Sequence, residues 1–141
     1  MTATAPVSPP PALGRAVERR LLLAVLLLGS GAAHLPVLQE HLREARWMGS
    51  LFAGFALACA ALAAALALSG ARILRIAAGA LCTAAVLTYA ATRLVAFPQL
   101  GDDVGNWAEP WGVVSIALEA LAAATAFGLT YRGPGAASGN G

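Results

Sequence analysis

Charged side chains are scarce in this chain of 141 residues: they make up 11% of it, and none of the nine basic residues is a lysine. A soluble domain of this length needs a more polar surface than so few charges can supply. Apolar residues instead account for 59% of the sequence, and the mean hydropathy is +0.73. The composition predicts one integral membrane domain whose partner is the lipid bilayer. The formal charge of +2 is too small and dispersed to indicate nucleic-acid binding.

Cysteine and catalytic motifs are scarce as well. Cys59 and Cys82 lie in apolar runs without a CxxC pair, and we interpret them as buried small residues that could share a membrane depth. No P-loop, dinucleotide fingerprint, nucleophile elbow or HExxH sequence occurs. The sequence therefore identifies no enzyme, and no cofactor is predicted apart from the metal ion considered below.

Four apolar segments are long enough to cross a bilayer, which takes about 20 helical residues. The second opens with Trp47 and contains no charge as far as Leu68, and the fourth is bounded by Trp111 and Tyr131, as an interfacial aromatic belt predicts. Pro98 is expected to stop the third. We predict an all-α, four-helix transmembrane bundle with spans at residues 17–35, 47–68, 73–97 and 111–131.

The connecting segments differ in character. Residues 36–46 place apolar and charged side chains on opposite sides of a helix, which predicts a short interfacial amphipathic helix between the first two spans. Residues 98–110 are acidic and rich in turn formers, so we expect them outside the hydrocarbon. Residues 1–14 and 133–141 have no apolar periodicity and are predicted to be flexible tails.

Arginine placement predicts the orientation. With both termini cytoplasmic, six arginines lie on the inner side and three on the outer side, in agreement with the positive-inside rule. The outer three are Arg43, Arg46 and Arg93. The exclusive use of Arg among many Ala, Leu and Gly residues is typical of a GC-rich bacterial genome, so we expect a bacterial plasma membrane.

A cleaved signal peptide is an alternative interpretation of residues 1–33. Arg19 and Arg20 precede a short apolar core that ends in small residues, and cleavage after Ala33 would leave His34 as the N-terminus and three spans. The charged region is long for a signal, which favours the four-span interpretation.

Glu119 is the clearest polar residue within a span. It lies eight residues beyond Trp111, which places it about 12 Å along the helix. A carboxylate at that depth needs a partner, and ionisable groups in hydrocarbon indicate functional sites. Arg93 is the expected partner and His34 a possible third member, so these three residues are the candidate ligand or ion pocket. The alternative is a purely structural role, in which Arg93 and Glu119 form a buried pair that only fixes the register of the third and fourth spans.

A metal site is a second hypothesis. His41 and Glu44 are three residues apart on one helical face, a spacing that can place an imidazole and a carboxylate on one metal ion. His34 would complete the set, although Pro36 intervenes. A charged interfacial surface is the commoner outcome of such a segment. Haem is disfavoured because both histidines lie near one end of the bundle.

Helix packing is indicated by Ser50, Gly54 and Ala58, which repeat at four-residue spacing. Small residues at this spacing let another helix approach closely. The pattern predicts tight packing on this face, with a membrane protein partner or self-association as a possible consequence.

The chain resembles a group of small uncharacterised integral membrane proteins of actinobacteria. The resemblance lies in HLPVLQEHLREARWMG, residues 34–49, and in ATRLVAFPQLGDDVGNWAEPWGVVSIALE, residues 91–119. The group has no established activity and implies no catalytic residue. Our leading expectation is an accessory or binding protein with an outer polar pocket. The alternatives are a membrane carrier or enzyme that uses Glu119 for proton handling, and an outer-face metal-handling protein.

Overall fold

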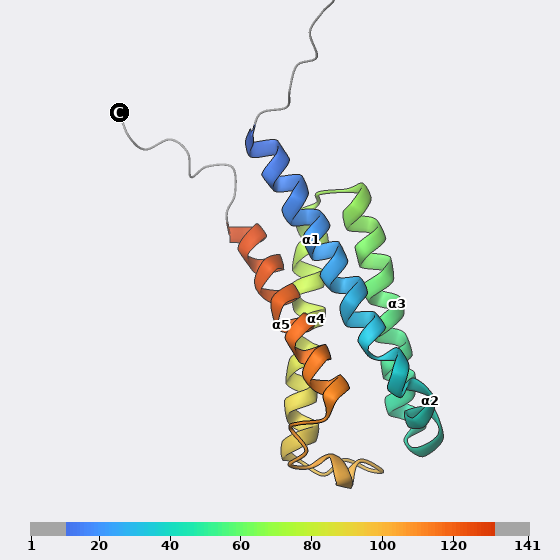
Figure 1. Ribbon diagram of the computed structural model, residues 1–141. Coiled ribbons are helices and arrows are strands. Elements are labelled where there is room, and N and C mark those ends of the chain that lie inside the picture. Colours follow the sequence, from blue (N-terminus) through green and yellow to red (C-terminus); the bar gives the residue numbers. More distant parts are fainter. Residues whose placement is uncertain (1–10, 132–141) are drawn as a thin grey trace, which may run out of the picture.

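The computed structural model describes the backbone of residues 11–131 and the side chains of residues 14–128. Within them the chain is all-α, as predicted, and its helices pack as a bundle (Figure 1). Residues 1–10 and 132–141 lie outside the described part, and with them most of the predicted N-terminal tail and all of the predicted C-terminal tail. The helices are α1 (Pro11–Ala33), α2 (Leu35–Glu44), α3 (Arg46–Leu68), α4 (Arg72–Leu94) and α5 (Pro110–Tyr131), with a 3-10 turn at Gly101–Asp103.

Helix boundaries follow local chemistry. The break between α1 and α2 falls at His34, and α2 then begins with Pro36 in its first turn, where the missing N–H of proline costs no helical hydrogen bond. Extended backbone at Ser69 separates α3 from α4. The first helix begins at Pro11, so residues 11–14 are helical although the sequence analysis assigned them to a tail.

Helix α4, which forms the predicted third span, ends three residues earlier than predicted, at Leu94 rather than Phe97. A longer helix would use the carbonyl oxygen of Arg93 to accept the N–H of Phe97. That oxygen instead accepts a hydrogen bond from the N–H of Gly105, at 2.9 Å. The loop that follows α4 therefore folds back and competes for the end of the helix.

The order of packing is α3, α1, α5, α4. The first helix packs against both α3 and α5, and α4 packs against α5, whereas α3 and α4 touch each other much less. The core between them contains Leu23, Leu27 and Leu66 together with Cys59 and Cys82, which are both buried as expected. Helices α1 and α5 thus form the centre of the bundle.

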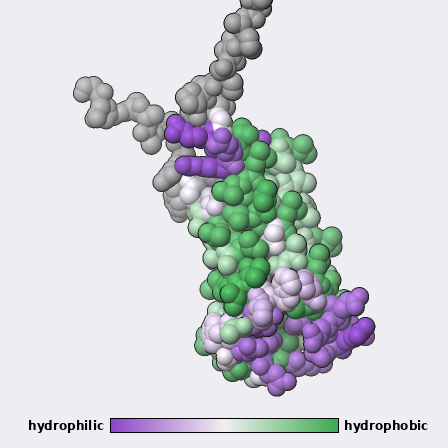
Figure 2. Space-filling model, in the orientation of Figure 1, coloured by the Kyte–Doolittle hydropathy of each residue, from purple (hydrophilic) through white to green (hydrophobic). Residues whose placement is uncertain are grey.

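On the face shown in Figure 2, a wide hydrophobic belt covers the middle of the bundle, and hydrophilic residues gather at both ends. Helices α3, α4 and α5 are each long and apolar enough to cross a membrane. Helix α1 carries charges near its start and is not apolar enough to count as a membrane span by itself. Together, α1 and α2 are long and apolar enough to form one span that is bent by 40°. The chain is therefore a multi-pass membrane protein with three or four spans. The start of α1 and the end of α5 lie at one end of the bundle, and α2 and the loop 95–109 lie at the other (Figure 1).

Candidate functional site

A cavity of about 600 Å³ opens at the end of the bundle that carries α2 and the loop 95–109. It lies where α3 and α4 diverge, because α3 is held by α1 and α4 by α5. Its walls come from α2, α3, α4 and α5, and residues from the loop complete them. The divergence of two helices that are neighbours in sequence thus creates a space inside the apolar belt.

The stripe of Ser50, Gly54 and Ala58 lines this cavity. A Cβ atom added at Gly54 would meet nothing within 4 Å, so no helix packs there. No helix of the described part of the chain makes the predicted close packing on this face, and packing by another protein there stays a prediction. The close approach on α3 is made instead at Ala56, whose backbone would lie 3.3 Å from a Cβ atom added at Gly31 of α1. The small residues in the stripe provide room for the cavity.

His34 and Glu119 lie next to each other in the wall of the cavity. The Nε2 atom of His34 lies 3.7 Å from Oε1 of Glu119, longer than a hydrogen bond. The Nδ1 atom of His34 lies 2.9 Å from the carbonyl oxygen of Ser30. Since a carbonyl oxygen only accepts, Nδ1 carries a hydrogen, and in the neutral imidazole Nε2 is then an acceptor. The pair can therefore hold one proton between a carboxyl group and an imidazole.

Glu119 is the most deeply buried ionisable side chain of the cavity, with 1% of its surface exposed. Its Oε1 atom has no hydrogen-bond partner among the described residues. The imidazole that faces it is fixed between two rings of α3, with ring centroids 4.7 Å from Phe52 and 4.9 Å from Phe55. Because a buried polar atom without a partner costs free energy, Glu119 is the residue whose place in the bundle most needs an explanation.

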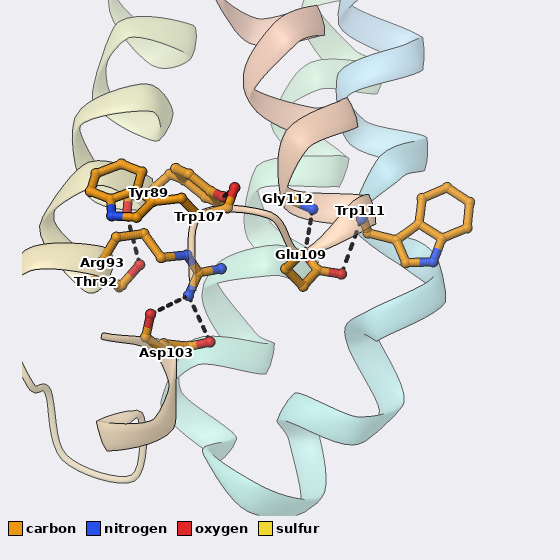
Figure 3. A network of polar contacts seen from close by, with 8 residues as sticks. All are labelled: Tyr89, Thr92, Arg93, Asp103, Trp107, Glu109, Trp111 and Gly112. Atoms are coloured by element: carbon orange, nitrogen blue, oxygen red, sulfur yellow. Dashed lines mark hydrogen bonds and ion pairs between the residues drawn. The ribbon is translucent and has the colours of Figure 1, made fainter. Parts of the chain in front are cut away.

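Arg93 is paired with Asp103, not with Glu119 as the sequence analysis expected (Figure 3). Its Nη1 atom lies 2.6 Å from Oδ1 of Asp103 and donates a second hydrogen bond to the carbonyl oxygen of that residue at 3.3 Å. The guanidinium also lies 4.6 Å from the centroid of the Tyr89 ring. All three predicted pocket residues line the same cavity, but only His34 and Glu119 lie next to each other, because Arg93 is paired with Asp103.

The loop 95–109 is tied to the ends of α4 and α5. The Tyr89 hydroxyl donates a hydrogen bond of 3.2 Å to the carbonyl oxygen of Trp107 (Figure 3). The Glu109 carboxylate accepts the backbone N–H groups of Trp111 and Gly112, which satisfies two donors at the start of α5. These contacts hold the acidic loop as one wall of the cavity. No signal in the sequence pointed to Asp103 or Glu109 individually.

The candidate metal ligands are not assembled. No three His, Cys, Asp or Glu side chains within the described part of the chain are arranged to hold a metal ion. The Nδ1 atom of His41 donates to the carbonyl oxygen of Val37 at 2.9 Å, and its ring packs against Phe52 at 4.9 Å. Glu44 is exposed on α2. The set of His34, His41 and Glu44 thus gains no support from the geometry.

Comparison with known proteins gives no relative from which a role could be transferred. No protein-family model, no curated protein and no solved structure matches this chain. The chain is a helical, multi-pass membrane protein, and four of its buried polar side chains line one cavity: Thr92, Arg93, Ser115 and Glu119.

Proposed function

We propose that this protein is a binding protein of the bacterial plasma membrane that holds a small amphipathic molecule in the cavity between α3 and α4. The observation that carries the proposal is the buried carboxyl group of Glu119, which lines the cavity and has one oxygen without a hydrogen-bond partner among the described residues. The resemblance to small membrane proteins of actinobacteria is consistent with this localisation.

The size and lining of the cavity support a ligand of this kind. A volume of about 600 Å³ falls within the range of small-molecule sites, which combine apolar walls with a few polar groups that fix orientation. Leu81, Ala58 and Phe55 provide apolar wall toward the middle of the helices, and His34 and Glu119 provide the polar groups. The apolar chain of the ligand would lie against the three apolar side chains, and its polar end would lie against His34 and Glu119.

Photolabelling tests the proposal. The probe is an alkyl diazirine that carries a hydroxyl group, applied to the protein in lipid nanodiscs, with labelled peptides identified by mass spectrometry. We expect saturable labelling of α3 and α4 peptides that line the cavity. Gly54→Leu should weaken it at least about tenfold, because the new side chain occupies the cavity and tenfold corresponds to about 1.4 kcal/mol of binding free energy.

Gly128→Leu is the matched control. Gly128 is also a helical glycine at which a Cβ atom would meet nothing within 4 Å, but it does not line the cavity. Labelling of this variant should equal that of the unmodified protein. A binding cavity would be refuted if labelling increased without saturation. It would also be refuted if only outward-facing residues such as Leu57 were labelled.

The orientation is part of the proposal, on the strength of the arginine bias. Asn106 and Ala71 are exposed at opposite ends of the bundle, and the two native cysteines are buried. In intact cells a membrane-impermeant maleimide should label Asn106→Cys, while Ala71→Cys should react only after lysis. The reverse pattern would place the cavity mouth on the cytoplasmic side.

A further inference from the structure

The cavity is lined by more acidic than basic groups. Arg93 is its only arginine among the described residues, and no lysine occurs in the chain. Arg43 and Arg46 do not line the cavity itself, but they border an adjoining surface hollow that shares Glu44, Ser50 and Gln99 with it. Six carboxyl-bearing side chains line it: Glu40, Glu44, Asp102, Asp103, Glu109 and Glu119. Such a space repels anions and favours cations, since clefts lined by one sign of charge concentrate the opposite sign.

Protein groups already engage some of these charges. Asp103 is paired with Arg93, so the single arginine is not available to Glu119. Glu109 is bound to the N–H groups at the start of α5. Glu119 differs from both, because it is 1% exposed and its Oε1 atom has no hydrogen-bond partner in the part of the chain that the structure describes. A carboxylate at that position requires a cation or a proton.

The geometry of His34 and Glu119 suits one nitrogen donor. With its hydrogen on Nδ1, the neutral imidazole presents Nε2 as an acceptor, and Glu119 presents an acceptor oxygen 3.7 Å away. A nitrogen about 2.8 Å from both atoms would form charge-assisted hydrogen bonds of ordinary length. Because Oε1 of Glu119 is covered by surrounding atoms, the two side chains must shift to admit that nitrogen. A protonated amine has several N–H groups and can donate to both atoms at once.

Aromatic rings lie beside His34 and elsewhere along the cavity lining. Phe52 and Phe55 pack on His34, and Tyr89 and Trp111 also line the cavity. The faces of aromatic rings attract ammonium groups, most strongly where water is excluded. The apolar wall that includes Ala58 and Leu81 accommodates a hydrocarbon body.

We infer that the ligand is an amphipathic organic cation, an alkylammonium whose N–H groups bind His34 and Glu119 and whose apolar part lies between α3 and α4. This inference rests on the proposed binding function and specifies its ligand class. An alcohol has a single O–H group and a carboxylate has none, so neither can donate to both acceptors.

Competition for photolabelling tests the ligand class. Hexylammonium, hexanol and hexanoate share one hydrocarbon chain and differ in charge, and an alkylamine is protonated at neutral pH as the lysine side chain is. Each competes with the hydroxyl-bearing diazirine, with empty nanodiscs to correct for partition into lipid. Hexylammonium should compete at a concentration about tenfold lower than hexanol, and hexanoate only at a higher concentration than hexanol.

Removing the charge of Glu119 should abolish the preference. In Glu119→Gln the cation and the alcohol are expected to compete within about threefold of each other. Glu18→Gln is the control, because Glu18 is exposed on α1 and does not line the cavity, and it should retain the tenfold preference.

The outcomes separate the two proposals. Saturable labelling with equal competition by all three compounds, or with hexanoate the strongest, overturns the cation and leaves the binding cavity standing. An absence of saturable labelling overturns the binding function itself. The order of competition in the unmodified protein decides the ligand class even if Glu119→Gln fails to fold.

Discussion

Asp103→Asn is expected to lower the free energy of unfolding by about 3 kcal/mol, because it leaves the charge of Arg93 buried without its partner. Arg93 is 7% exposed, and its carboxylate partner lies 2.6 Å away on the loop that follows α4. An uncompensated charge in such a place costs more than the ion pair itself contributes. Titration of the micelle-bound protein with a denaturing detergent, followed by circular dichroism, measures the change.

Asp102→Asn provides the matched control for this prediction. Asp102 is the preceding residue in the same turn, it is exposed, and its substitution removes the same formal charge. Surface substitutions of this kind change stability by no more than about 0.5 kcal/mol. Equal effects of the two variants would mean that the loss arises from net charge or loop chemistry, and that the buried pair with Arg93 contributes nothing specific.

The placement of Arg93 shows where sequence reasoning was incomplete. Hydropathy locates the helices well, because each span must satisfy its backbone hydrogen bonds internally and must be long enough for the bilayer. The same reasoning extended α4 to Phe97 and left Arg93 a full turn inside a span. The loop instead returns to the end of α4, where Gly105 binds the carbonyl oxygen of Arg93 and Asp103 binds its side chain. A contact made by a returning loop has no periodic signal in the sequence.

Glu119 was easier to recognise, because a carboxyl group in an apolar helix has few explanations. Its depth followed from the helical rise alone. Its actual neighbour, His34, was named only as a third member, since the break between α1 and α2 that directs the imidazole inward depends on tertiary packing. The stripe of small residues around Gly54 was recognised, but sequence cannot tell whether such a stripe meets a helix or a cavity.

The interface between α2 and α3 is expected to be the part of the fold most sensitive to a single methyl group. A Cβ atom added at Gly49 would lie 2.7 Å from both the backbone nitrogen and Cγ of Leu42. A side chain can rotate away from such a contact, but the backbone of α2 cannot. Gly49→Ala should therefore displace α2 and lower the free energy of unfolding by about 1–3 kcal/mol, measured by the same detergent titration.

Gly54→Ala, five residues further along the same helix, should instead raise the free energy of unfolding. Nothing lies within 4 Å of its added Cβ atom, and alanine in a helix is favoured over glycine by about 0.5–1 kcal/mol. If both variants gain stability, α2 is not packed on α3 as closely as the structure indicates. The first turn of α2 follows directly from His34, which lines the cavity. If Gly49→Ala is less stable and also labels more weakly, while Gly54→Ala stays stable, the position of α2 controls the cavity.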